Sequence, residues 1–385
     1  MRIALVIDRF DPGKGGAEAY LASFGEWLRS RGHEVAFLSQ DAAPGGADAT
    51  GARRIEIPGR RAPRPLRDAL FLGAAAARIA SFDASLGVRA TVGTTVYAPH
   101  GGVYRAAARA NLDSVRSAPL RVAKRAVRAV SPKHLFLGRA DAAALRSERT
   151  RHLVAVSGRV ARDIESALGR PDPRIRVVRN GVDLARFHPE NRLAYRAPMR
   201  KRLSLADGEA ALLFVAHNFR LKGIDTALAA VARLKDRARP QKLLVAGRGH
   251  RARAERLARR LGLGPGTVSF LGDVRETAGL YAAADVLVHP TFYDPASLVT
   301  LEAMASGLPV VTTREDGTSE LLKPGVEGEV IEDPRDSASL AAAIERLLAP
   351  GRARRAGEAA RRRAEEWPWT RNFAEMEALL GGRDG

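Results

Sequence analysis

Short apolar runs alternate with segments of helical periodicity from the first residues onward. In the first half, the apolar runs predict strands at 2–8, 33–39, 53–58, 152–157 and 174–180. A helix from about Ala17 to Arg31 follows the first of these strands after a glycine-rich turn. Uninterrupted apolar strands between helices are typical of a parallel sheet covered on both faces. This half therefore predicts a doubly wound α/β domain.

The same alternation starts again after a polar stretch at 189–201. Its predicted strands are 211–218, 242–248, 268–273, 285–291, 308–313 and 328–331. We expect two Rossmann-like domains, at 1–185 and 200–367, and a final helix at 368–385 that packs back on the first domain. Ligands of such sheets bind beyond the carboxyl ends of the strands. The two domains are therefore expected to face a central cleft that holds the chemistry.

Composition narrows the class of protein. The 385 residues are 45% hydrophobic and include no cysteine, which excludes a disulfide framework and suits a reducing compartment. The apolar run after Met1 and Arg2 is too short for the core of a signal peptide. No segment reaches the ~18 apolar residues that a bilayer-spanning helix needs. We expect a cytoplasmic protein.

The formal charge of +20 favours polyanionic neighbours, and it is concentrated between Tyr104 and Arg151, where twelve basic residues stand against three acidic ones. Within this region, 118–132 predicts a proline-bounded amphipathic helix. Its basic face is Arg121, Lys124, Arg125 and Arg128, and its apolar face is Leu120, Ala123, Val127 and Val130. Such a helix predicts contact with an anionic membrane surface. The alternative is a surface helix packed on its own domain.

Nucleic acid is the other polyanion to consider. Binding of single strands would call for aromatic platforms among the basic residues, and only Tyr104 and Phe136 are aromatic in this region. The sequence therefore argues against a nucleic-acid partner.

The segment "DPASLVTLEAMASG" (294–307) carries two acids in apolar surroundings. Asp294 followed by Pro295 predicts an N-cap and the start of a helix over about 295–306. A bare carboxylate at Glu302 in this apolar helix would cost several kcal/mol without a partner. Two vicinal ribose hydroxyls would supply one, and the free amides near Ser297 would suit a phosphate. In the alternative reading, Asp294 only caps the helix and Glu302 meets an arginine.

Four further segments offer ligand chemistry at predicted strand ends. In "HNFRLKGID" (217–225), Lys222 and Arg220 could bind a diphosphate, although a solvated basic turn is equally consistent. The glycines of "VAGRG" and "FLGDV" would let a flat base approach the backbone, or form ordinary turns. The loop "FDPGKGGAEAY" (10–20) could bind an anion, but it matches neither the dinucleotide fingerprint nor a Walker loop. His100 could donate to a substrate hydroxyl or have only a structural role.

Motifs of other chemistries are missing from the sequence. It contains no Asp-x-Asp pair, no His-Glu-x-x-His and no Gly-x-Ser-x-Gly. We therefore expect no metal, no cofactor and no serine nucleophile.

Taken in order, "GKGGAE", "FVAHNFRLKG", "LLVAGRG", "FLGD" and "DPASLVTLEAMASGLPVVTT" resemble glycosyltransferase family 4, retaining enzymes of the GT-B fold. The resemblance covers essentially the whole chain. It implies a donor site on the second domain and an acceptor that enters from the first.

The resemblance also assigns roles to individual residues. Glu302 would hold the ribose, and Lys222 the diphosphate. The remaining implied donor and catalytic residues are Gly15 and Gly16 over the phosphates, Ser297, Leu298 and Val299 at the phosphate-binding helix start, Arg248 and Val274 at the base, and His100 and Asp294 at the transferred sugar. Two departures stand out: Asp294 replaces the family's glutamate, and His217 occupies the usual place of an arginine, whose charge Arg220 would supply.

The activity implied is metal-independent transfer of a hexose from a nucleoside diphosphate sugar, UDP-glucose or similar. The acceptor would be a glycan or glycolipid at the inner face of the cytoplasmic membrane, such as lipopolysaccharide core. Rival readings are a nucleotide-sugar epimerase of the same fold and a basic nucleic-acid-binding protein. A nicotinamide oxidoreductase is a third rival, although its fingerprint is missing from "GKGGAE".

Overall fold

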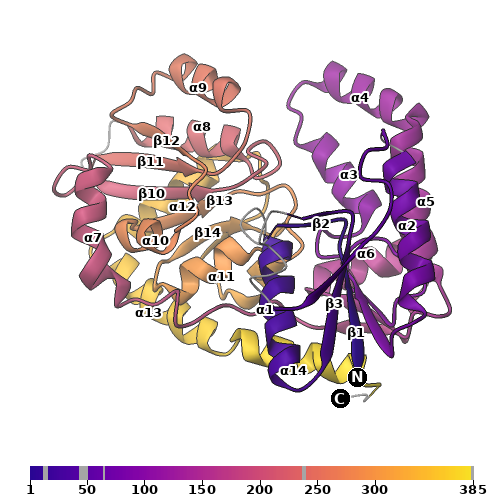
Figure 1. The fold of residues 1–385 in the computed structure, drawn as a ribbon. Helices are drawn as coiled ribbons and strands as arrows, with labels where there is room; N and C mark the ends of the chain where they lie inside the picture. The colour runs from indigo at the N-terminus through magenta and orange to yellow at the C-terminus, as the bar shows by residue number, and fades with distance from the viewer. Residues whose placement is uncertain (12–15, 43–50, 64–65, 236–239, 383–385) are drawn as a thin grey trace. The chain divides into compact units, whose positions relative to one another are not determined.

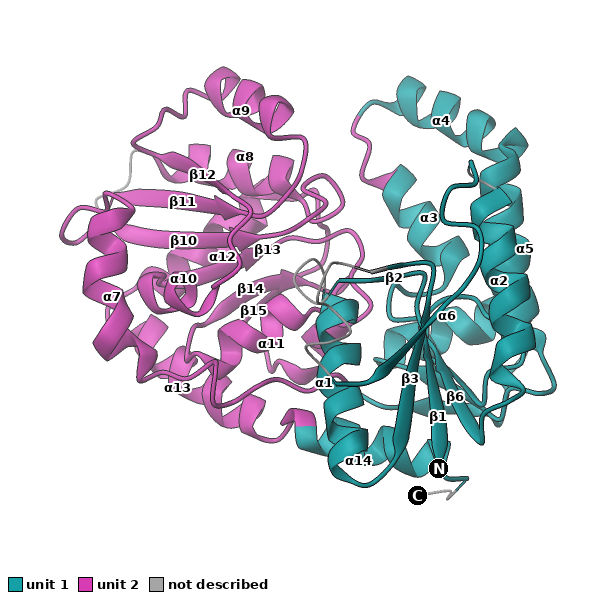
Figure 2. Ribbon diagram, in the orientation of Figure 1, with its two compact units in different colours: residues 1–112, 117–179, 370–385 teal, residues 113–116, 180–369 magenta. Residues whose placement is uncertain are grey.

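The structure is a computed structural model that describes residues 1–11, 16–42, 51–63, 66–235 and 240–382 (Figure 1). The chain divides into two compact units (Figure 2). Unit 1 comprises Met1–Leu112, Ser117–Arg179 and Thr370–Gly385, and unit 2 comprises Asp113–Arg116 and Asn180–Trp369. Each unit contains one large parallel sheet.

The sheet of unit 1 has seven parallel strands in its described part. Their order across the sheet is β5 (Arg53–Glu56), β3 (Glu34–Ser39), β1 (Arg2–Val6), β6 (Ala84–Gly87), β7 (Val96–Tyr97), β8 (His152–Ala155) and β9 (Ile175–Val177). A two-stranded sheet of β2 (Arg9–Phe10) and β4 (Asp41–Ala42) stands beside it. The chain thus builds outward from β1 in both directions, so the order reverses between β1 and β6.

Alternate residues of these strands bury against helices on opposite faces of the sheet. Ala4 and Val6 of β1 pack with Phe71 and Ala75 of α2 (Leu66–Ile79). On the other face, α1 (Gly16–Ser30) comes so close that a Cβ on Gly25 would lie 2.8 Å from the ring of Phe37. Both faces are therefore dry, which explains why the strand sequences are uninterrupted apolar runs.

The remaining helices of unit 1 are α3 (Tyr104–Asp113), α4 (Ala118–Val130), α5 (Pro132–Arg146), α6 (Gly158–Leu168) and α14 (Trp369–Leu380). Helix α14 packs against α1 although more than three hundred residues separate them in sequence. Phe373 lies with its ring centroid 5.4 Å from that of Phe24, and the Trp27 indole donates to Glu377 Oε2 at 3.0 Å. The end of the chain thus completes the hydrophobic layer of the first helix.

Over the residues that the structure describes, the sheet of unit 2 has six parallel strands. Their order is β12 (Val268–Gly272), β11 (Gln241–Ala246), β10 (Ala210–Val215), β13 (Val286–His289), β14 (Val310–Thr313) and β15 (Gly328–Ile331). Helices α8 (Ile224–Leu234) and α12 (Ser337–Leu348) cover one face, and α10 (Ala278–Ala283) and α11 (Leu298–Ala305) cover the other. Helices α7 (Asn191–Arg202), α9 (Arg251–Arg260) and α13 (Arg352–Glu365) complete the unit. This is the strand order of a doubly wound dinucleotide-type fold.

The helix predicted at 118–132 ends two residues earlier in the structure. Helix α4 stops at Val130, with Ser131 as its C-cap, and Pro132 starts the separate helix α5. The residue before a proline is pushed out of the helical region, and Ser131 is extended, with φ −74° and ψ 119°. In the described part of the chain, no helix is long and apolar enough to cross a membrane.

The order of the unit 2 sheet reverses between β10 and β13, and the loops that leave these two strands meet closely. Gly223, the N-cap of α8 at the end of the first loop, has φ +79°. A Cβ built on Gly223 would lie 1.9 Å from the Pro290 carbonyl oxygen of the second loop. Both the backbone angle and the lack of space therefore require glycine here.

We predict that Gly223→Ala lowers the free energy of unfolding by more than about 2 kcal/mol, because it adds a steric clash to the strain of a positive φ. Gly208→Ala is the matched control, since Gly208 has φ +76° but no atom within 4 Å of its would-be Cβ. Gly208→Ala should lower the free energy of unfolding by about 1 kcal/mol, which is the cost of the backbone strain alone. Urea unfolding followed by tryptophan fluorescence measures both variants, and equal losses would contradict the close approach of the two loops.

Candidate functional site

An ion pair joins the two loops at the reversal point of the unit 2 sheet. Lys222, in the loop after β10, places its Nζ 2.6 Å from Asp294 Oδ2, in the loop after β13. The same Nζ donates to the Tyr293 carbonyl at 3.0 Å. The buried His289, at the end of β13, adds a contact from Nε2 to Asp294 Oδ2 at 3.1 Å. Burial alone would raise the pKa of Asp294, but Lys222 and His289 outweigh it and hold this pKa below its usual value.

Asp294 is not the N-cap of helix α11, so the predicted start of this helix was wrong. The helix begins at Leu298, and Ser297 is its N-cap, with Oγ accepting from the Thr300 amide at 3.2 Å. The reason is tertiary: the Asp294 carboxylate is already bound by Lys222 and His289, and its backbone runs beside that of Asp316. The helix therefore starts three residues later than the Asp-Pro pair indicates.

Asp316 anchors the start of α11 and was not found from the sequence. It is fully buried, and it accepts from the Ser297 amide at 3.2 Å and from the hydroxyls of Thr300 and Thr312 at 2.8 and 3.0 Å. Burial and the nearby Asp294 charge raise its pKa. Its only sequence signal is that it is one of two acids shortly after the end of an apolar strand, β14 (Val310–Thr313). This network satisfies the amides on either side of the first helical turn.

The amides of Leu298 and Val299 are left without a hydrogen-bond acceptor among the described residues. They are the first two helical residues of α11, and both are half-buried rather than covered. Unpaired amides at a helix start, together with the helix dipole, favour an anion. The structure thus provides two amide donors and the Lys222 ammonium in adjoining loops of one unit.

Glu302 lies in the middle of α11, and its partner is neither an arginine nor free solvent. Tyr281 of α10 donates its hydroxyl to Glu302 Oε2 at 2.7 Å. Burial raises the pKa of Glu302 to about 7, against the opposing effects of Tyr281 and Arg186. In the described residues no donor reaches Oε1. A carboxylate with one oxygen held and the other open is suited to accept from a ligand hydroxyl.

The raised pKa makes Glu302 a source of pH-dependent stability. The folded protein keeps a proton on Glu302 that the unfolded chain, in which glutamate has its ordinary pKa of 4.5, releases. This contribution to stability is fully present below pH 4.5 and is lost as pH rises through about 7.

Three other predicted residues lie at neighbouring strand ends of unit 2. Arg220 donates from Nε to Ser114 Oγ at 3.2 Å. Arg248 is exposed and pairs with Asp273, with Nε 3.4 Å from Oδ2. Val274 is half-buried and packs on the hydrophobic core that includes Tyr281. The strand ends thus present a charged side chain and an apolar one next to each other.

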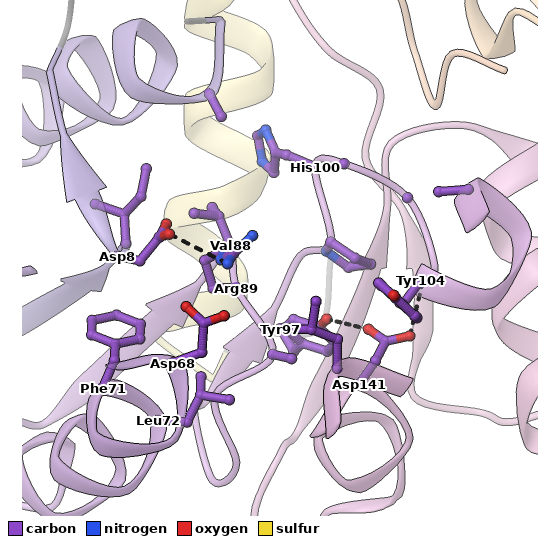
Figure 3. Close-up of a pocket in the computed structure, with 18 of the residues that line it drawn as sticks. Asp8, Asp68, Phe71, Leu72, Val88, Arg89, Tyr97, His100, Tyr104 and Asp141 are labelled. Atoms are coloured by element: carbon purple, nitrogen blue, oxygen red, sulfur yellow. Dashed lines mark hydrogen bonds and ion pairs between the residues drawn. The ribbon is translucent and has the colours of Figure 1, made fainter. Parts of the chain in front are cut away.

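Among the predicted residues of unit 1, His100 lines a pocket of about 350 Å³. The pocket is lined from the carboxyl ends of β1, β6 and β7, at the reversal point of that sheet (Figure 3). His100 lies on its wall, with its ring centroid 4.6 Å from that of Tyr20. Burial lowers the pKa of His100 to about 4, so this side chain is neutral at physiological pH. Gly16 is the exposed first residue of α1, and Gly15 lies outside the described residues.

The charges of this pocket are arranged in specific pairs. Arg89 Nη2 lies 3.3 Å from Asp8 Oδ2. Asp141 accepts from the Tyr97 hydroxyl at 2.7 Å and from the Tyr104 amide at 3.0 Å. Burial raises the pKa of Asp141, and these two donors oppose the effect. Within the described residues, no cluster of three or more His, Asp or Glu side chains has the arrangement of a metal site.

Two family models match the chain, one on each half. The model described as Glycosyltransferase Family 4 matches residues 14–186. The model described as Glycosyl transferases group 1 matches residues 209–350. With its two parallel sheets and the donors gathered at the end of the second, the chain belongs to the family 4 glycosyltransferases of GT-B fold.

Individual relatives cover a range of acceptors. The chain is 37% identical to a D-inositol 3-phosphate glycosyltransferase of Geodermatophilus obscurus over 237 residues, which are 59% of this chain and 51% of the relative. It is 30% identical to the lipopolysaccharide glucosyltransferase WaaG of Escherichia coli K12 over 215 residues, 55% of this chain and 57% of the relative. The chain spans about half the length of the curated relatives it matches.

Solved structures establish the fold over the whole chain. The crystal structure of WaaG, a glycosyltransferase of lipopolysaccharide biosynthesis, aligns with a TM-score of 0.82 at 22% identity, covering 99% of this chain and 100% of its own. The Anabaena protein HepE in complex with UDP-glucose aligns with a TM-score of 0.76 at 18% identity, covering 99% of this chain and 100% of its own.

We predict that Lys222→Ala lowers the free energy of unfolding by about 3 kcal/mol, because it leaves the largely covered Asp294 carboxylate with His289 as its remaining partner. Adding Asp294→Asn should recover more than half of this loss, since the uncompensated charge is then removed. Lys201→Ala, at an exposed lysine of α7, is the control and should have no measurable effect. A double-mutant cycle by urea unfolding tests this, and additive effects would show that the two charges do not stabilise each other.

Proposed function

We propose that this protein is a retaining glycosyltransferase that moves a hexose from a nucleoside diphosphate sugar to a hydroxyl of a membrane-associated glycan. UDP-glucose is the favoured donor, and lipopolysaccharide core is the favoured class of acceptor. The observation that carries the proposal is the group of donors and acceptors at the reversal point of the unit 2 sheet. There the Lys222 ammonium, two free amides of α11 and the half-open Glu302 carboxylate lie on adjoining elements.

Each part of a nucleotide-sugar has a matching group in unit 2. The diphosphate would lie at Lys222 and the amides of Leu298 and Val299, with Arg220 as a second cation. The ribose hydroxyls would donate to Glu302, whose Oε1 has no protein donor within the described chain. The base would lie at the half-buried Val274, beside Arg248. A uridine nucleotide is favoured because HepE, a structural neighbour, was crystallised with UDP-glucose.

Stabilisation of the leaving diphosphate is the main task of the protein in this reaction. The acceptor hydroxyl attacks the anomeric carbon from the face that the diphosphate leaves, and a phosphate oxygen of the leaving group takes the proton. Lys222 and the two amides offset the charge that develops on the diphosphate, an effect worth about 10²–10³ in rate for one such donor. Asp294 holds the Lys222 ammonium in place and receives a hydroxyl of the transferred sugar. His100, being neutral, serves as a hydrogen-bond donor to that sugar and not as a cation.

Helix α4 supports a membrane-associated acceptor. None of its residues is buried, and the exposed fractions of Leu120, Val122, Val127 and Val130 are 48%, 67%, 66% and 75%. Basic side chains occur on the same helix at Arg121, Lys124 and Arg125. Arg128 has a structural role instead, because it donates to Asn111 Oδ1 at 2.7 Å and so ties α4 to α3. Exposed valines and leucine beside basic residues suit an anionic bilayer surface.

The decisive test of the donor site is the pH dependence of nucleotide binding. If ribose hydroxyls bind the ionised form of Glu302, whose pKa is about 7, the affinity for UDP should rise about tenfold between about pH 6 and about pH 8. Calorimetry in buffers of different ionisation enthalpy should show a proton released on binding at pH 7. Glu302→Gln should bind more weakly and without this pH dependence. An affinity of the natural protein for UDP that does not change with pH would refute the role of Glu302.

Incubation with the nucleotide-sugar alone tests the rival function. Conversion of the donor to an epimer without any acceptor would favour an epimerase.

The membrane assignment is tested by vesicle sedimentation. Replacing Arg121, Lys124 and Arg125 together by Glu should reduce partition onto phosphatidylglycerol-containing vesicles by more than about 100-fold, at about 1 kcal/mol per basic side chain. The control replaces Arg256, Arg259 and Arg260 of α9 by Glu, because these residues are exposed on another helix and the change in net charge is the same. The control should keep most of its binding. An equal loss in both variants would mean that net charge, not helix α4, directs binding.

A further inference from the structure

Asp68 is a carboxylate inside the pocket of unit 1 that the fold does not use. It lies in the first turn of α2, is only 8% exposed and lines the pocket. No hydrogen bond or ion pair to Asp68 occurs within the described part of the chain. Figure 3 shows its carboxylate pointing away from α2 into the space near Arg89 and Tyr97. The other two aspartates of the pocket interior, Asp8 and Asp141, are both paired.

The Asp68 carboxylate has no protein donor among the described residues, and its oxygens open into the pocket, where only water can hydrate them. The dipole of α2 favours an acid in its first turn, but an exposed aspartate there would gain as much without burial. A carboxylate that points into a cavity with both oxygens accessible suits a ligand that brings hydrogen-bond donors.

The described lining of the pocket is acidic, in contrast to the net charge of the chain. Among its described lining residues, Asp8, Glu18, Asp68 and Asp141 are acids, and the guanidinium of Arg89 is already paired with Asp8. Burial raises the pKa of Glu18, and the nearby charges of Asp8 and Asp11 raise it further. A ligand with a phosphate or carboxylate at this place would meet like charges without a free cation among these residues to offset them.

We propose that this pocket binds the acceptor sugar and that the ring it receives carries no anionic group. Two neighbouring hydroxyls of that ring donate to the two oxygens of Asp68. The inference rests on the proposed glycosyltransferase function, since it names the acceptor of that same reaction. A volume of about 350 Å³ lies at the small end of ligand pockets and suits one or two sugar rings. The basic helix α4 then contacts the anionic membrane surface around a glycolipid, and the acidic pocket binds the uncharged sugar ring of that glycolipid.

The test measures binding of four probes to the full chain saturated with UDP, by saturation-transfer NMR. The probes are the methyl glycosides of glucose, of glucosamine, of glucose 6-phosphate and of glucuronic acid. The neutral and the amino glycoside should bind at least about tenfold more tightly than the two anionic ones. Asp68→Asn should weaken the neutral probe about tenfold, the loss expected for a hydrogen bond to a charged group. The same substitution should also reduce the difference in affinity between the neutral and the anionic probes.

Asp83→Asn is the matched control, since Asp83 is an exposed aspartate of the same unit that does not line the pocket. Asp83→Asn should change neither the affinity for the neutral probe nor the difference in affinity between the neutral and the anionic probes.

The outcomes separate this inference from the proposed function. Equal binding of the anionic probes, no binding of any probe, or an unchanged affinity in Asp68→Asn would each overturn the role of the pocket. None of these results bears on UDP binding, which the proposed function assigns to unit 2. Failure to bind any nucleoside diphosphate or nucleotide-sugar would overturn the proposed function instead.

Discussion

The charge of Asp294, whose side chain is only 14% exposed, sets the arrangement of the loops at the reversal point of the unit 2 sheet. The carboxylate lies between an ammonium and an imidazole, and all three come from the ends of strands β10 and β13. Because a buried carboxylate is costly unless paired, the contact fixes the two loops where the sheet order reverses. Helix α11 must then start at Ser297 and leave two amides open, and Asp316 secures that start from the neighbouring strand end. The cation and the amides are thus held in place before any ligand arrives, which is the condition for stabilising a leaving group efficiently.

The net charge of +20 conceals regions of opposite sign. The loops at the reversal point of the unit 2 sheet contribute cations and amides, whereas acids line the described part of the unit 1 pocket. Helix α4 adds basic residues next to exposed apolar ones. An enzyme that handles a diphosphate donor, an uncharged sugar ring and an anionic lipid surface would need this separation. Average charge would have suggested only a general preference for polyanions, and it says nothing about which ligand binds where.

Long, uninterrupted apolar runs made most strands predictable, and both large sheets follow from them. The strands that escaped prediction are short or polar: β6 reads Ala-Ser-Leu-Gly, and β2 and β4 have two residues each. The start of α11 was misplaced because an Asp-Pro pair is a strong local signal, and a lysine 72 residues away competes for the same aspartate. The partner of Glu302 could not be foreseen either, since nothing marks Tyr281 in a short apolar helix. His289 did give a signal, as a lone polar residue in a buried strand, and it could have been found. Asp68 gave none, because an acid in the first turn of a helix is ordinary.

The long-range contact of helix α14 with α1 affects how the chain folds during its synthesis. During synthesis, the first helix leaves the ribosome hundreds of residues before the segment that covers Phe24 and Trp27. Until then, the aromatic side of α1 has only part of its final cover, and all of unit 2 is made in the interval. The first unit to be translated is thus the last to be completed, and a nascent chain would depend on chaperones to shield that face. A chain that ends just before Phe373 would have all of unit 2 but would lack the residues that cover the aromatic side of α1 in unit 1.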